Sequence, residues 1–222
     1  MTFRLPAPAR RTLRRYGALP LSTRAHVWLR WLSCPFPAVE AAVPRYGRIL
    51  DLGCGHGLLT LYLADCGSER DVHGVDIDMA KLVEARTAAF GTAVRFDVVT
   101  ADWSPPLQPT WDAIVLVDVL YLMGTGAGAA LLATAAAAIR PGGRIVIKEI
   151  AMQPRWKYRL AVAQERAATS AAVTAGAAVD FLAPRQIVTV LEAAGMVVTT
   201  RSIDRGYPHP HLLVLGDRPA ER

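Results

Sequence analysis

Short apolar runs alternate with helical patterns along most of the chain. Five runs have the length and composition of buried parallel strands, namely residues 48–52, 71–75, 94–99, 111–118 and 144–150. Stretches with a helical pattern lie between and after them: Leu58–Cys66, Met79–Phe90, the alanine-rich run Gly126–Arg140, and Pro184–Gly195. Met196–Ile203 and His211–Leu215 then form a terminal hairpin pair. This alternation predicts an α/β domain built on a mostly parallel sheet.

Two segments lie outside this alternation. Residues 1–47 are basic and aromatic, and His26–Leu32 within them has the pattern of a short amphipathic helix. This helix could cap a site at the sheet edge, lie at an interface or pack on the core. Ala151–Asp180 is an alanine-dominated insertion after the fifth strand, and this position predicts a lid over the carboxyl ends of the strands, with Trp156 and Tyr158 facing the site beneath it. We therefore expect an N-terminal extension over residues 1–47 and one domain over 48–222, with the lid at about 151–180.

The first strand ends in a glycine-rich loop. Asp51 is followed by glycines at alternate positions, Gly53, Gly55 and Gly57, and the helical stretch Leu58–Cys66 begins directly after them. Glycine tolerates positive φ and lets a ligand lie directly on the backbone. We therefore expect main-chain N–H groups of this loop to hold a ligand at the helix N-terminus. A glycine-rich turn without a ligand is the alternative.

The spacing of the glycines limits which ligand this is. A dinucleotide fingerprint requires glycine or alanine where Leu58 or Thr60 stands, so the NAD interpretation is weakened. A Walker phosphate loop is excluded, because no Gly-Lys-Ser/Thr follows.

Length and composition favour a single compact α/β domain. The chain has 222 residues and is 52% hydrophobic, which suffices for one core. Its three cysteines are odd in number and have no ligand spacing, so neither a disulfide framework nor a metal site is expected. Since no apolar run has the length of a membrane span and the basic N-terminus is not followed by an apolar segment, we expect a soluble protein in the reducing cytoplasm.

The net charge of +6 is concentrated near the N-terminus. The arginines that carry it are Arg4, Arg10, Arg11, Arg14, Arg15, Arg24 and Arg30. Such an arm could attract phosphate-bearing substrates, nucleic acid or an anionic membrane surface. A solvated, partly disordered tail is the alternative.

The segment Asp51–Gly57, with the pattern Asp-x-Gly-x-Gly-x-Gly, resembles the first motif of class I S-adenosylmethionine-dependent methyltransferases. The Trp111-Asp112 pair that opens the fourth strand and the helix-turn-strand of Ile139–Ile147 are similar to the same family, so the resemblance covers roughly Arg48–Gly216. It implies a Rossmann-like, doubly wound sheet of seven strands with the last one antiparallel. It also implies S-adenosyl-L-methionine as cofactor, bound by the loop residues Asp51, Gly53, Cys54, Gly55 and Gly57.

Further cofactor contacts are expected at the next strand ends. Asp76 ends the second strand about twenty residues past the glycine loop, where a carboxylate can accept hydrogen bonds from both ribose hydroxyls, and Ile77 adjoins it. Asp78 is expected to N-cap the following helix. The resemblance assigns Asp102 and Trp103 to the adenine, although an acid in a surface turn is the alternative.

Three residues are candidates for acting on the acceptor. Asp118 and Tyr121 lie at the end of the fourth strand, where they could position the acceptor, take its proton or serve the fold, and Asp118 is also expected to bind the cofactor. His209 is a candidate general base. With His211 it could ligate a metal, but no third ligand is evident and a rigid turn is preferred.

The resemblance implies in-line methyl transfer. The hydrophobic lid, the aromatic N-terminal helix and the absence of a recognisable nucleic-acid module favour a small or lipid-like hydrophobic acceptor, which we expect to be an oxygen nucleophile. A nucleic-acid methyltransferase is the first alternative, but a base-holding Asn/Asp-Pro-Pro-Tyr/Phe motif is missing where Asp118-Val119-Leu120-Tyr121 stands. A non-catalytic cofactor-binding module and an NAD-dependent oxidoreductase are the others. Peripheral membrane contact through the N-terminal arm stays open, and the sequence does not predict an oligomeric state.

Overall fold

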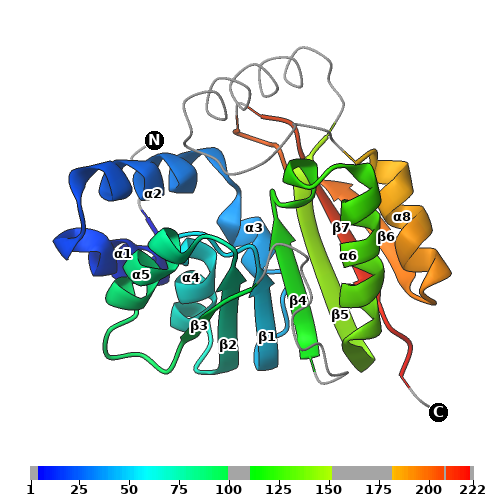
Figure 1. The fold of residues 1–222 in the computed structure, drawn as a ribbon, viewed down its shortest axis with the longest axis horizontal. Coiled ribbons are helices and arrows are strands. Elements are labelled where there is room, and N and C mark those ends of the chain that lie inside the picture. Colours follow the sequence, from blue (N-terminus) through cyan, green and yellow to red (C-terminus); the bar gives the residue numbers. More distant parts are fainter. Residues whose placement is uncertain (1–4, 100–110, 152–181, 208, 221–222) are drawn as a thin grey trace.

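The computed structural model describes residues 5–99, 111–151, 182–207 and 209–220 (Figure 1). The adenine contacts predicted at Asp102 and Trp103, and the lid with Trp156 and Tyr158, lie outside the described residues.

Seven strands form one sheet in the order β3-β2-β1-β4-β5-β7-β6. Their bounds are β1 Tyr46–Leu52, β2 Glu69–Asp76, β3 Arg95–Val98, β4 Trp111–Val117, β5 Ile139–Ile150, β6 Val197–Ser202 and β7 His211–Asp217. Only β7 pairs antiparallel to its neighbours; the pairings among β1 to β5 are parallel. The predicted seven-stranded, mostly parallel sheet with an antiparallel last strand is therefore confirmed.

Helices cover both faces of this sheet (Figure 1). The α-helices are α1 Ala7–Arg15, α2 Leu21–Ser33, α3 Phe36–Glu40, α4 Leu58–Cys66, α5 Met79–Ala88, α6 Thr125–Ala137 and α8 Pro184–Ala193, and two short 3₁₀ helices are η1 Tyr16–Ala18 and η2 Leu120–Leu122. Buried side chains of α1 to α5 form one apolar core with one face of the sheet. Those of α6 and α8 form a second core with the other face.

The N-terminal segment departs from the prediction. Residues 7–33 form α1, η1 and α2, so helix extends well beyond the predicted His26–Leu32. Their side chains Ala9, Leu13, Tyr16, Val27 and Trp31 are buried in the same core as α4. The interpretation as a solvated, partly disordered tail is therefore wrong for these helices, because apolar residues at helical spacing give them a face that packs on the domain.

The boundary before β5 also differs from the prediction. The alanine-rich helix α6 ends at Ala137, and β5 begins at Ile139 rather than at Arg144. Ile139 pairs with Trp111, and Arg144 pairs with Ala113, so the register shifts between these two pairs. The Pro141-Gly142-Gly143 segment, predicted to be a turn, is thus the extra length of an irregularity inside the strand.

Candidate functional site

The three loop glycines between β1 and α4 serve different purposes. All three have positive φ, at 82° for Gly53, 54° for Gly55 and 75° for Gly57. A Cβ on Gly53 would lie 2.5 Å from Val119 Cγ2, and one on Gly57 would lie 2.6 Å from Phe96 Cζ. A Cβ on Gly55 would meet nothing within 4 Å. Gly53 and Gly57 are therefore required by packing, whereas Gly55 exposes bare backbone to open space.

Four N–H groups of this loop donate hydrogen bonds within the protein. Gly53 N and Cys54 N donate to Val75 O at 2.8 and 3.0 Å, and Gly57 N donates to Cys54 O at 2.9 Å. Gly55 N donates to Asp76 Oδ2 at 2.7 Å. The expectation that these four N–H groups hold a ligand is therefore corrected. The loop offers an open backbone surface at Gly55 beside a carboxylate.

That carboxylate, Asp76, links two elements at the end of β2. In addition to Gly55 N, it accepts a hydrogen bond from Asp78 N at 2.9 Å through Oδ1. Asp78 accepts from Ala80 N and Lys81 N, which confirms it as the N-cap of α5. The backbone bonds fix the Asp76 carboxylate beside the loop, and each of its oxygens has lone-pair capacity for a further donor. The neighbouring Ile77 is 39% exposed.

Asp51 lies beneath the loop. It is 2% exposed, and its Oδ2 accepts a hydrogen bond from Thr60 Oγ1 of α4 at 2.6 Å. Burial raises the pKa of Asp51 to about 7; nearby Asp76 acts in the same direction and the Thr60 bond opposes it. Burial likewise raises the pKa of the Cys54 thiol well above its usual range. The bond from Thr60 to Asp51 holds the loop on α4 from within.

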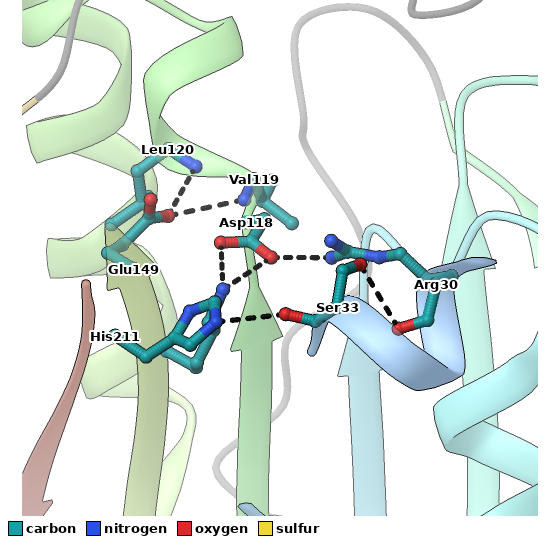
Figure 2. A network of polar contacts seen from close by, with 8 residues as sticks. Arg30, Ser33, Asp118, Val119, Leu120, Glu149 and His211 are labelled. Atoms are coloured by element: carbon teal, nitrogen blue, oxygen red, sulfur yellow. Dashed lines mark hydrogen bonds and ion pairs between the residues drawn. The ribbon is translucent and has the colours of Figure 1, made fainter. Parts of the chain in front are cut away.

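A second polar cluster lies where β4 and β5 end (Figure 2). The carboxylate of Asp118 accepts hydrogen bonds from Lys148 Nζ at 2.6 and 2.7 Å and from Arg30 Nη2 of α2 at 2.5 Å. Burial opposes its charge, but the Lys148 and Arg30 cations outweigh burial and hold the pKa of Asp118 well below its usual range. A carboxylate bonded by two cations is a weak proton acceptor, so this arrangement favours positioning over base catalysis.

Asp118 also has an unusual backbone. Its φ is 56°, and among the described residues it is the one non-glycine residue with a positive φ. Such conformations cost free energy and persist where surrounding contacts enforce them, often at functional sites. Here the two cations hold the side chain, and Asp118 N donates to Lys148 O at 2.9 Å.

Glu149 and His211 complete the cluster. Glu149 Oε1 accepts from Val119 N and Leu120 N at 3.2 and 3.0 Å, and burial, with Asp118 nearby, raises its pKa to about 8. The Nε2 atom of His211 lies 2.9 Å from Ser33 O, so Nε2 carries the proton, and Nδ1 is buried without a partner in the described structure. Burial lowers the pKa of His211 to about 3, so the ring is neutral.

The remaining predicted catalytic residues adjoin this cluster. Tyr121 is buried in η2, three residues beyond Asp118. His209 lies in the connection from β6 to β7, with its ring 5.9 Å from that of His211. Within the described residues no group of three metal-ligating side chains occurs.

The N-terminal helices cover the glycine loop. Tyr16 Oη donates to His56 O of the loop at 2.7 Å. The ring of His26 on α2 lies 4.8 Å from that of His56, and Thr23 Oγ1 donates to Glu84 of α5 at 2.9 Å. Together with the Arg30–Asp118 bond, these contacts place α2 as a cap across both polar clusters.

Sequence reasoning missed Arg30, Tyr16 and the Lys148–Asp118 pair. Lys148, in β5, pairs with Asp118, which follows β4. An arginine in the middle of an otherwise apolar helix stretch was the one local signal for Arg30.

The chain matches a family described as "Methyltransferase domain" over residues 49–143. It is 28% identical to a ubiquinone biosynthesis O-methyltransferase of Aeromonas salmonicida over 158 residues, which cover 70% of the chain and 65% of the relative. It is 31% identical to a trans-aconitate 2-methyltransferase of Acidovorax sp. over 167 residues, which cover 67% and 62%. The chain thus spans less than two thirds of the length of these curated relatives.

Solved structures share the fold. An O-methyltransferase family protein from Burkholderia thailandensis superposes with a TM-score of 0.67 at 20% identity, covering 94% of the chain and 63% of that protein. The magnesium protoporphyrin IX methyltransferase from Synechocystis, solved with bound SAH, superposes with a TM-score of 0.63 at 19% identity, covering 94% and 93%.

Proposed function

Because the chain belongs to the class I S-adenosylmethionine-dependent methyltransferases, we propose that it methylates a small or lipid-like hydrophobic acceptor at an oxygen atom. S-adenosylmethionine, the cofactor of this family, supplies a methyl group activated on a sulfonium. One observation carries the proposal. The open backbone of Gly55 lies beside the Asp76 carboxylate, at the carboxyl ends of β1 and β2. This position adjoins β4, where the strand order reverses and ligands of doubly wound sheets bind.

The residues on the cofactor side divide into contacts and supports. Asp76 accepts hydrogen bonds from the ribose hydroxyls, with Ile77 beside it, and the Gly53–Gly57 loop supplies a surface without side chains at Gly55. Asp51 acts from below by fixing the loop to α4, and Cys54 packs against the core beneath the loop. Asp102 and Trp103 stay predictions for the adenine.

On the acceptor side we assign a positioning role to Asp118. Lys148 and Arg30 hold its carboxylate in one orientation, so its oxygens keep fixed positions beside the proposed cofactor site. In-line transfer requires the acceptor oxygen to be held in line with the methyl carbon and to lose its proton. We assign proton removal to His209 and acceptor positioning to Tyr121.

Oxygen is favoured as the methylated atom by the names of relatives. The Aeromonas relative is named for O-methylation in ubiquinone biosynthesis.

Calorimetry and methyl-transfer assays test the proposal. S-adenosylmethionine and S-adenosylhomocysteine are expected to bind with micromolar or tighter affinity, and NAD is expected not to bind. Radiolabelled methyl transfer to size-matched apolar phenols, carboxylic acids and amines is expected to favour the oxygen acceptors. Equal binding of NAD, or transfer confined to amines, would contradict it.

The variant His209→Gln should lower kcat with little change in cofactor affinity, and an unchanged kcat would remove His209 as the base.

The contacts made by the basic arm weaken the case for a nucleic-acid methyltransferase. Arg11 and Arg15 pair with Asp65, and Arg30 pairs with Asp118, so these cations already serve the fold. Tight, steeply salt-dependent binding of RNA or DNA, with methyl transfer to it, would favour this alternative instead.

A further inference from the structure

Helix α2 carries apolar side chains on its outer face. Four of them are exposed, Leu21 by 77%, Trp28 by 44%, Leu29 by 66% and Leu32 by 51%. Their helical spacing places them along one side, opposite the buried Thr23, Val27 and Trp31. We call the four exposed residues the α2 stripe. Exposing large apolar side chains together is unfavourable in water, so a partner surface would be stabilising.

Helices α1 and α2 themselves carry charge of only one sign. Residues 1–39 contain seven arginines and no Asp or Glu. Arg10 and Arg14 of α1 and Arg24 of α2 are exposed, and their side chains make no hydrogen bond or ion pair with the described residues. These three cations, unlike Arg15 and Arg30, therefore have no structural duty in the described part of the chain.

The three arginines converge on one cavity between α1 and α2. It has a volume of about 330 Å³, and Arg10, Arg14, Arg24 and Trp28 contribute to its lining. Guanidinium groups bind phosphate through paired, charge-assisted hydrogen bonds. A tryptophan at the rim matches the preference of indole for the boundary between polar headgroups and hydrocarbon. The cavity thus provides the chemistry that a phosphate headgroup needs, next to the α2 stripe.

We propose that this surface docks the protein on membranes containing anionic phospholipids. Headgroup phosphates bind Arg10, Arg14 and Arg24, Trp28 lies at the boundary, and Leu21, Leu29 and Leu32 enter the acyl region. Helix α2 lies on the bilayer, since no helix in the described parts of the chain is long and apolar enough to cross one. Helices α1 and α2 lie on the opposite side of the molecule from α6 and α8 (Figure 1).

The arginines and the exposed leucines together favour an anionic membrane over a second copy of the chain or a nucleic acid. A second copy of the chain would bring the same arginines together and repel, and a nucleic acid would leave the leucines exposed. The inference goes beyond the proposed function, because vesicle binding can be measured without cofactor or acceptor.

Vesicle sedimentation tests the proposal with the full chain. The protein should bind vesicles of phosphatidylcholine with 30% phosphatidylglycerol at least tenfold more tightly than pure phosphatidylcholine vesicles, and less tightly at high salt. Leu29→Glu together with Leu32→Glu should weaken binding at least tenfold, and the triple change of Arg10, Arg14 and Arg24 to Gln should do the same. Emission of Trp28 should be quenched by brominated lipid, and Trp28→Phe should lose that quenching.

Matched controls distinguish this surface from general stickiness. Phe90→Glu removes an apolar side chain that is 91% exposed at the end of α5, and Arg201→Gln removes an exposed cation of β6. Both should bind vesicles within twofold of the wild type. Binding that ignores phosphatidylglycerol content, or that the controls weaken equally, would overturn the proposal. The proposal would also be overturned if the protein did not bind vesicles and instead formed a dimer that Leu29→Glu dissociates. The surface would then bind a second copy of the chain.

Discussion

At the residue scale, Gly55 can be compared with Gly91, a second open glycine that lies outside the proposed site. Gly55 and Gly91 both have positive φ, 54° and 76°, and a Cβ on either would meet nothing within 4 Å. Replacing either residue by valine should therefore cost about 1–2 kcal/mol of stability through backbone strain. Only Gly55→Val should also abolish S-adenosylmethionine binding, because its side chain would fill the surface beside Asp76. Calorimetry and urea unfolding of both variants measure this; wild-type affinity in Gly55→Val would remove the loop from the site.

The carboxylate of Asp76 carries a second prediction. Asp76→Ala should weaken cofactor binding by about 1.5–3 kcal/mol, the range for hydrogen bonds to a charged group. The matched control is Asp97→Ala on the adjacent strand β3, where the carboxylate is exposed and bonds His73 at 2.7 Å. Its affinity should equal that of the wild type. If both variants bind equally well, the ribose contact lies elsewhere.

At the element scale, the ion pair between Arg30 and Asp118 helps to hold α2 over the sheet edge. Arg30→Gln should remove the charged bond to Asp118, lowering the free energy of local opening by about 1–3 kcal/mol. Hydrogen exchange of α2 amides should then quicken at least fivefold, while those of β4 and β5 stay protected. Arg24→Gln on the exposed face of the same helix should leave exchange unchanged. Unaltered protection in Arg30→Gln would mean that packing of Val27 and Trp31 alone holds the helix.

The elements also mark where sequence reasoning succeeds. Strand β1, the glycine loop and α4 were predictable, because an apolar run, alternate glycines and an apolar helix follow one another within about twenty residues. The Asp78 N-cap was predictable for the same reason. Arg30 and Asp118 are 88 residues apart, and Lys148 is 30 residues beyond Asp118. Their contact depends on how α2 crosses the sheet, which no local pattern encodes.

At the scale of the whole molecule, two buried acids should make stability depend on pH. The folded pKa values of Asp51 and Glu149 are raised to about 7 and about 8, above the ordinary 3.8 and 4.5. The folded state therefore holds these protons more tightly than the unfolded state. Their stabilising contribution is complete below about pH 4 and declines as pH rises through 7 and 8, by up to ~1.4 kcal/mol per pH unit for each group.

Urea unfolding between pH 5 and 8 measures this decline. Glu149→Gln keeps an acceptor for Val119 N and Leu120 N but cannot ionise, so its stability should fall less steeply with pH. Asp118 does not interfere in this window, since its lowered pKa makes its contribution decline only in stronger acid. A slope identical to that of the wild type would show that Glu149 is ionised throughout.

The antiparallel direction of β7 fixes where the polypeptide leaves the domain. Its first residue, His211, pairs with Ile150 beside the cluster at the strand ends, and its last, Asp217, pairs with Arg144, six residues earlier in β5. Arg218 then donates to Ala136 O at the end of α6, which holds the departing backbone there. An affinity tag or fluorophore attached beyond this point would lie at the amino-terminal ends of the parallel strands, opposite the Gly55 loop. Immobilisation through that end would leave the Gly55 surface facing the solution.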